Sequence, residues 1–140
     1  MKQKFSTKWK ASKQPRKQRK YLANAPLHIK RKLLSVNLSK ELRKKYGKRN
    51  IIVAKGDVVK IMRGKFSKKQ GKVTQTRTKM QKIYIEGIQR KKTDGSKVNI
   101  PIRPSNLQIA QLNLDDKKRI RKIEKKKMEN TKKKVREEGK

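Results

Sequence analysis

The clearest pattern along the chain is an alternation of apolar and polar residues between positions 51 and 113. Val58 to Met62 is interrupted only by Lys60 and has the length and β-branched content of a strand. A second strand enters at Lys72-Val73, after a polar and basic loop. Further alternation predicts three more strands, around Ile83 and Ile85, around Val98, Ile100 and Ile102, and around Leu107 and Ile109. We therefore expect five short antiparallel strands in this section.

Turn signals separate these strands. Gly64 and Gly71 bracket the first loop, where we expect the backbone to turn with positive φ. Asp94-Gly95 is a strong short turn signal, and Arg103-Pro104-Ser105-Asn106 is typical of a tight turn. Pro101 restricts its strand to an edge or an end. Because five short strands bury an open sheet poorly, we predict a mainly β fold with a small closed barrel, which leaves no exposed edges.

Helical signals precede the β section. Pro15 and Pro26 can each begin a short helix, since the missing N–H of proline would be unpaired at a first helical position. Ser39 is a good N-cap for a third helix, which Gly47 ends. These helices predict an N-terminal arm with a hinge at residues 47–50.

The pattern becomes helical again after the β section. Asp115 and Asp116 suit a helix N-terminus, while Ile120 and Ile123 form an apolar stripe too narrow for a core. We predict a basic surface helix here. The expected organisation is a basic arm over 1–50, a barrel over 51–113, and a basic helix and tail over 114–140.

The net charge of the chain changes how the basic loop between the first two strands is interpreted. Lys and Arg total 46 against 10 Asp and Glu, for a net charge of +36 over 140 residues. Such a charge disfavours a compact free monomer through self-repulsion, and it is far above the magnitude of about 2–8 that a small domain needs for solubility. Five cations in a loop would otherwise be an ordinary solvated turn. With this composition they favour a polyanionic partner.

Several function classes find little support. There are no cysteines, so neither a disulfide nor a Cys-ligated zinc is expected, and we predict no metal site and no cofactor. No apolar run approaches the roughly 18 residues of a membrane span, so we predict no membrane partner. The single histidine, His28, stands among cations, where contact with phosphate is a better explanation than general base catalysis. Asp57, which follows Gly56, is interpreted as turn chemistry. We expect neither an enzyme nor a small-molecule substrate.

The nature of the polyanion follows from what the chain lacks. The cationic segments have only scattered apolar residues rather than the broad apolar face of a membrane-binding helix. No helix-turn-helix or zinc motif for reading DNA is present in the sequence. Phe66 and Trp9 are the candidates for base stacking, although packing explains each slightly better. These points favour recognition of folded RNA through its shape and phosphates.

Two groups of residues are the candidate phosphate contacts. In the arm they are Lys13, Arg16, Lys17, Arg19, Lys20, His28, Lys30, Arg31 and Lys32, and in the predicted hairpin they are Arg63, Lys65, Lys68, Lys69 and Lys72.

The hairpin section resembles the KOW motif, found in SH3-like barrels of ribosomal proteins and transcription elongation factors, through Gly56-Asp57-Val58-Val59, Ile61, Arg63-Gly64, Phe66 and Gly71-Lys72-Val73. The wider chain resembles the universal large-subunit ribosomal protein twenty-four family in its archaeal and eukaryotic form, called twenty-six in eukaryotes. The further motifs are Gln14-Pro15-Arg16-Lys17-Gln18-Arg19-Lys20, Asn24-Ala25-Pro26-Leu27-His28, Leu38-Ser39-Lys40-Glu41-Leu42-Arg43 and Arg103-Pro104-Ser105-Asn106. The resemblance covers roughly residues 13 to 125.

This resemblance implies a five-stranded SH3-like barrel in a structural, cytoplasmic protein of the large ribosomal subunit. It also implies binding to the 5′ region of large-subunit ribosomal RNA, a place near the polypeptide exit beside other large-subunit proteins, and support of subunit assembly. The family loop commonly reads Gly-x-Phe/Tyr-Lys-Gly-x-x-Gly-Lys-Val, whereas Ser67 and Lys68 take the Lys-Gly places here. A KOW module of a transcription elongation factor is the alternative, although no α/β pattern of the kind such factors carry precedes the barrel.

Overall fold

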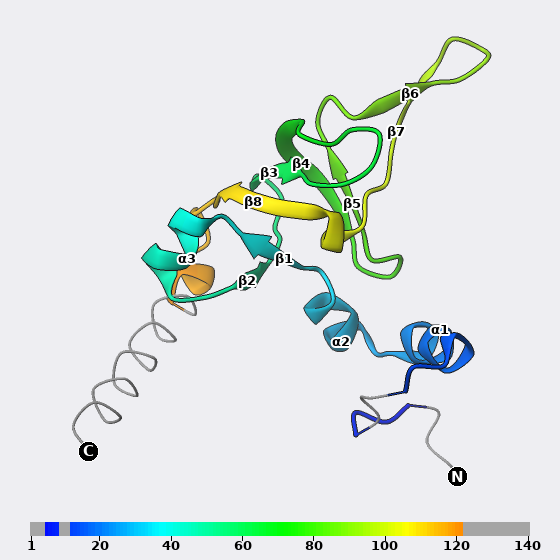
Figure 1. The fold of residues 1–140 in the computed structure, drawn as a ribbon, viewed down its shortest axis with the longest axis vertical. Helices are drawn as coiled ribbons and strands as arrows, with labels where there is room; N and C mark the ends of the chain where they lie inside the picture. The colour runs from blue at the N-terminus through cyan, green and yellow to red at the C-terminus, as the bar shows by residue number, and fades with distance from the viewer. Residues whose placement is uncertain (1–4, 9–11, 122–140) are drawn as a thin grey trace.

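The computed structural model describes residues 5–8 and 12–121, which form a β-rich body with helices before and after it (Figure 1). The helices are α1 (Pro15–Asn24), α2 (Leu27–Lys32), α3 (Lys40–Tyr46) and the 3₁₀ helix η1 (Pro104–Asn106). The strands are β1 (Ser35–Leu38), β2 (Asn50–Ile52), β3 (Val58–Ile61), β4 (Gln70–Arg77), β5 (Lys82–Ile85), β6 (Gln89–Lys91), β7 (Lys97–Asn99) and β8 (Leu107–Gln111). Residues 117–121 are also helical.

Six of the strands form one sheet in the order β2-β1-β8-β3-β4-β5. β1 runs parallel to β8 and antiparallel to β2, whereas β3 pairs antiparallel with both β8 and β4. β6 and β7 form a separate two-stranded sheet, which Figure 1 shows projecting from the body. The mainly β fold is thus confirmed, and the strands expected around Val58, Val73, Ile83 and Ile109 are present.

The closed five-stranded barrel is wrong, because the large sheet has six strands and its edge strands β2 and β5 do not pair with each other. Three strands, β1, β2 and β6, were not foreseen. In β1, Val36 and Leu38 both face the core, at 1% and 0% exposure. The alternation of buried and exposed residues in β1 covers only four positions between two helices. A pattern this short did not predict a strand.

The expected strand from Val98 to Ile102 is divided. Val98 pairs with Arg90 in the β6–β7 hairpin, and Ile102 forms an isolated antiparallel bridge with Ile83 of β5. Pro101 lies between the two pairings and has no N–H to donate to a continuous ladder. This proline therefore limits how far the sheet can extend around the core.

The core lies on one face of the large sheet and is built mainly of aliphatic side chains. Val59, Ile83 and Ile109, from β3, β5 and β8, are each 0% exposed. The half-buried Phe66, from the loop between β3 and β4, packs against this cluster. The packing prediction for Phe66 is therefore confirmed, and the rigid cluster fixes where the loop leaves the sheet. Trp9 lies outside the described residues.

Local sequence explains the helix ends. Pro15 is the first residue of α1, as predicted, whereas Pro26 immediately precedes α2. The Ser39 hydroxyl accepts a hydrogen bond from Leu42 N at 3.3 Å, which caps α3. Gly47 ends α3 with a φ of 61°. The three predicted helices of the arm are therefore confirmed.

Gly64 turns with a φ of 94°, as expected, but the prediction of positive φ at Gly71 is wrong. Gly71 lies within β4, where an added Cβ would come within 2.7 Å of both Glu86 O and Ile85 Cγ2. Strand β4 must therefore have no side chain at this point so that the neighbouring backbone can approach.

Asp57 is fully buried, and its carboxylate accepts hydrogen bonds from backbone N–H groups and from Arg119. Its carboxylate accepts hydrogen bonds from Ala54 N and Asn113 N, both at 2.8 Å. The Arg119 guanidinium adds two bonds of 2.7 Å, one to each carboxylate oxygen. The turn interpretation is correct for the bond to Ala54. The bidentate ion pair was missed because 62 residues separate its partners in the sequence.

The ion pair fixes the start of the C-terminal helix to the sheet. Arg119 also donates to Asn113 O at 2.8 Å and to Ile52 O at 3.2 Å. At the first turn, Asp116 Oδ1 accepts from Lys118 N at 2.8 Å, as expected of an acidic residue at a helix N-terminus. The predicted stripe is described only at Ile120, since Ile123 lies outside the described residues.

Candidate nucleic-acid interface

The loop between β3 and β4, residues 62–69, is closed by backbone hydrogen bonds. Ile61 N donates to Lys69 O at 2.9 Å, and Lys68 N donates to Ile61 O at 2.8 Å. Within the loop, Ser67 N donates to Gly64 O at 2.9 Å and the Ser67 hydroxyl donates to Met62 O at 3.2 Å. These bonds define the loop backbone before any partner is bound.

Lys68 holds an unusual conformation in this loop. Its φ is 71°, in the left-handed region that non-glycine residues rarely adopt. This is the position where the family pattern commonly has glycine. The departure at Lys68 therefore preserves the turn and adds a cation at its tip, at a cost in backbone strain.

The predicted cations of the hairpin all point to solvent. Arg63, Lys65, Lys68, Lys69 and Lys72 are exposed, and they form no salt bridge with any carboxylate in the described residues. Lys69 Nζ lies 5.6 Å from the centre of the Phe66 ring, a cation–π contact that restricts this side chain. The structure brings these five cations together on one loop and the strand that follows it.

The cations of the first arm helix, α1, lie on a helix that buries none of its residues. None of the residues of α1 is buried, and Arg16, Lys17, Arg19 and Lys20 are all exposed, as is Lys13 just before the helix. Like charges one turn apart repel each other along the helix. The local support comes from Tyr21, whose ring lies 4.8 Å from that of Phe5. The isolated arm is therefore electrostatically unfavourable without a polyanion.

Helix α2 continues the basic surface with one exception. His28, Arg31 and Lys32 are exposed, whereas Lys30 is half-buried and its Nζ donates to Ala23 O at 3.1 Å. Lys30 thus connects α2 to α1 and is less available to phosphate than its neighbours. Figure 1 shows α1 and α2 extending away from the sheet, so the structure does not bring the arm cations together with those of the β3–β4 loop.

Other exposed cations were not singled out from the sequence. The β6–β7 hairpin has Arg90, Lys91, Lys92 and Lys97, and all four are exposed. Its turn is held by Asp94, whose carboxylate accepts from the Ser96 hydroxyl at 2.7 Å and from Ser96 N at 2.9 Å. These two bonds, the hydroxyl first, lower the pKa of Asp94 from its ordinary value of 3.8. The signal that could have found this basic hairpin was the predicted Asp94-Gly95 turn flanked by Lys and Arg.

Metal binding has no cluster of ligands to support it in the part of the chain that the structure describes. There, no three His, Cys, Asp or Glu side chains gather in a way that could hold a metal ion. Among the helices of the described ranges, none has the length and apolar character required to cross a bilayer. What the described surface offers is a set of exposed cations on the arm helices, the β3–β4 loop and the β6–β7 hairpin.

A comparison with protein families is consistent with this surface. Residues 12–126 match the model of the ribosomal proteins L26 (eukaryotic) and L24 (archaeal). The chain belongs to this family. The match includes both the arm helices and the β3–β4 loop, so the ribosomal resemblance seen in the sequence is confirmed.

Membership of the L26/L24 family establishes the general role. The chain is a ribosomal, RNA-binding protein of translation and a structural constituent of the large subunit, not a member of an enzyme family. An elongation-factor module has no support from the match, which extends well beyond the KOW motif on both sides.

Proposed function

We propose that this L26/L24 family protein binds large-subunit ribosomal RNA in the 5′ region through two basic surfaces. One is the arm, with the cations of residues 13–32, and the other is the hairpin loop, with Arg63, Lys65, Lys68, Lys69 and Lys72. The observation that supports this proposal best is that these hairpin cations are exposed and have no carboxylate partner in the described residues. Each can therefore replace counterions on a phosphate.

The two surfaces suit folded RNA for different reasons. The β3–β4 loop holds its backbone with internal hydrogen bonds, so its cations can fit a fixed phosphate geometry at low entropic cost. The arm has no buried residue in α1 and can follow an RNA surface. Folded RNA is recognised by its shape through contacts to phosphates, because side chains cannot reach the bases in the deep, narrow major groove of A-form RNA.

Family resemblance supplies the cellular setting of the proposal. We infer a cytoplasmic protein that lies near the polypeptide exit, contacts neighbouring large-subunit proteins and supports subunit assembly. Strands β3, β4, β5 and β8 with η1 would correspond to the SH3-like unit that the KOW resemblance implies. Strands β1 and β2 would be additions at one edge of this unit.

The salt dependence of binding tests the distributed interface. The ligand is a transcript of the 5′ region of large-subunit RNA, and the control is a duplex RNA of equal length. With roughly 6–10 phosphate contacts, we expect the slope of log affinity against log salt to be about −4 to −9. A slope no steeper than one or two contacts predict would show that the proposed interface is wrong. Equal affinity for the two RNAs would contradict specificity for the 5′ region.

A further inference from the structure

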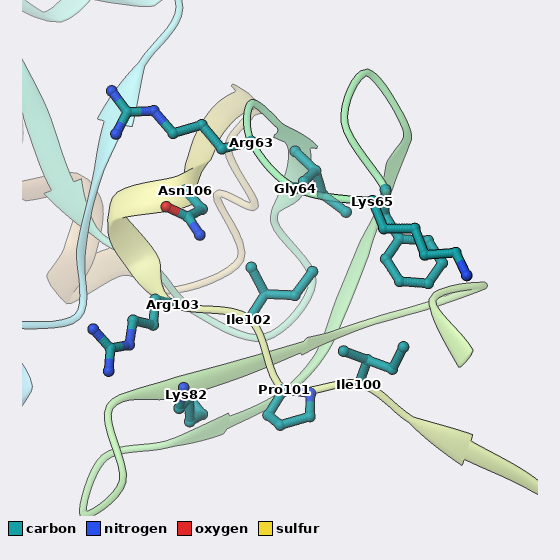
Figure 2. A pocket seen from close by; sticks show the side chains of 11 residues that line it. Arg63, Gly64, Lys65, Lys82, Ile100, Pro101, Ile102, Arg103 and Asn106 are labelled. Carbon is teal, nitrogen blue, oxygen red and sulfur yellow. The ribbon is translucent and has the colours of Figure 1, made fainter. Parts of the chain in front are cut away.

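A shallow groove of about 390 Å³ lies beside the β3–β4 loop, between that loop and residues 100–106. Its apolar lining includes Ile100, Pro101 and Ile102, together with the half-buried Phe66. Figure 2 shows these first three residues between Lys65 on one side and Arg103 on the other. The groove is therefore an apolar surface with cations at its margins.

Charge around this groove has one sign. Arg63, Lys65, Lys82 and Arg103 all line it, and no carboxylate does. Arg103 and Lys82 were not among the candidate phosphate contacts predicted from the sequence, because they lie outside the hairpin motif. An occupant must therefore combine an apolar face with negative charge.

Asn106 adds the means to recognise a polar edge. It lines the groove from η1, where its own backbone oxygen is already engaged by Met62 N at 2.8 Å. Its side-chain amide makes no hydrogen bond to any of the described residues. An amide offers both a donor and an acceptor, the combination that pairs with the edges of nucleobases.

We propose that this groove binds a single nucleotide extruded from folded RNA, with its base on the apolar surface and its phosphates on the surrounding cations. The proposal rests on the proposed RNA binding of the adjacent loop and adds a site for one base. Unpaired bases in folded RNA are commonly splayed out and stacked on aromatic rings or guanidinium planes. Phe66 supplies a ring in this groove, and the exposed Arg63 and Arg103, whose side chains extend outward from its margin in Figure 2, carry guanidinium groups that can turn onto a bound base.

The size of the groove agrees with this occupant. Its volume is near the lower end of the range of about 300–1,000 Å³ that small ligands occupy. An A-form helix offers its bases only inside stacks, so a paired base could not enter. An acidic proline-rich peptide is the competing occupant, but the Asn106 amide and four cations around one short apolar surface favour a nucleotide.

Two RNA duplexes that differ by one base test the proposal. The first has a single bulged adenosine, and the second has an abasic nucleotide at the same position, so their phosphates are equal in number. If the base enters the groove, the wild-type protein should bind the adenosine bulge roughly 5- to 150-fold more tightly, the range that base–aromatic stacking gives. Affinities are measured by titration with fluorescently labelled RNA at one fixed salt concentration.

Substitutions then place the effect in the groove. Phe66→Leu keeps apolar bulk but removes the ring, and Arg103→Gln removes a guanidinium plane that would stack on the base itself. Each should bring the ratio of the two affinities closer to one. The matched control is Arg90→Gln in the exposed β6–β7 hairpin, which should weaken binding to both duplexes equally and leave the ratio unchanged. Thermal unfolding verifies that the variants are folded.

The outcomes distinguish the proposed nucleotide site from the proposed binding of large-subunit RNA. A wild-type ratio near one, or a ratio that survives both Phe66→Leu and Arg103→Gln, overturns the nucleotide site even if salt-dependent binding to large-subunit RNA is intact. Loss of that general binding would instead contradict the proposed function. Binding of an acidic proline-rich peptide that Arg103→Gln abolishes, together with a ratio near one, would make the groove a peptide site and also overturn the proposal.

Discussion

The arm and the β3–β4 loop both present cations, but they hold them in opposite ways. In α1, which supplies four of the arm cations, no residue is buried and the charges repel one another along an exposed helix. In the loop, backbone hydrogen bonds and the buried side chains of Val59, Ile61 and Val73 in the flanking strands hold the backbone that carries the cations. The comparison teaches that charge density alone does not define an interface. The loop is organised by its own hydrogen bonds, whereas no residue of α1 is buried to offset the repulsion among its cations.

Deleting residues 1–24 should have the largest effect on binding. The deletion ends before Ala25, which is 5% exposed, and therefore removes the first arm helix without touching the core. We expect affinity for large-subunit RNA to fall at least about a hundredfold at low salt and the salt slope to become shallower, since several phosphate contacts are lost. The melting temperature should be unchanged. Unchanged affinity would assign all binding to the loop and its neighbours.

Asp57→Asn should have the largest effect on stability. The substitution leaves the Arg119 guanidinium without its buried anion, and breaking such a pair costs about 3–5 kcal/mol. Chemical denaturation of the full chain measures the change in unfolding free energy. Asp94→Asn, in an exposed turn, is the matched control and should cost much less. A cost below about 1 kcal/mol for Asp57→Asn would mean that the C-terminal helix is not fixed by this pair.

Gly71→Ala should distort the strand on which the loop is built. The added Cβ would come within 2.7 Å of the backbone oxygen of Glu86, which cannot move as a side-chain end can. We expect a loss of about 1–3 kcal/mol, in the range for an overpacked core. Gly64→Ala is the control, because its Cβ meets nothing within 4 Å and only its φ of 94° opposes the change. If Gly64→Ala proves the costlier of the two, close approach is not the constraint at Gly71.

Lys68→Gly should have the smallest effect, and it should raise the unfolding free energy rather than lower it. Glycine relieves the left-handed φ of 71°, so we expect a gain of up to about 1 kcal/mol, against the loss of one phosphate contact. The salt slope should become shallower by roughly 0.7–0.9. Lys65→Gly removes the same charge where φ is not positive and should stabilise nothing. A destabilised Lys68→Gly variant would show that the lysine side chain, rather than its charge alone, supports the loop.

Sequence patterns predicted those parts of the fold that depend on neighbouring residues. The caps at Ser39 and Gly47, the start of α1 at Pro15 and the turn at Gly64 all follow from local chemistry, and all are confirmed. The long-range features were not predictable in this way. The pairing of β1 with β8 and the ion pair between Asp57 and Arg119 join segments far apart in the chain, and neither has a local signature.

The residues of the candidate site were also predictable only where a local pattern marks them. The hairpin cations were predictable because a motif and two glycines bracket them, and the structure shows them exposed together. The groove cations Lys82 and Arg103 were not, because they meet the loop only through folding of β5 and η1 beside it. The contacts with RNA assigned to these residues stay predictions.

The parallel pairing of β1 with β8 bears on the order in which the newly made chain matures. About seventy residues separate Leu38 from its neighbour Gln108 in the sequence. At a synthesis rate of roughly 5–20 residues per second, several seconds pass between the emergence of the first strand and that of its partner. During this interval the cationic helices have already left the ribosome while the sheet that anchors them is incomplete. The basic N-terminal helices are thus exposed before the sheet that follows them is complete.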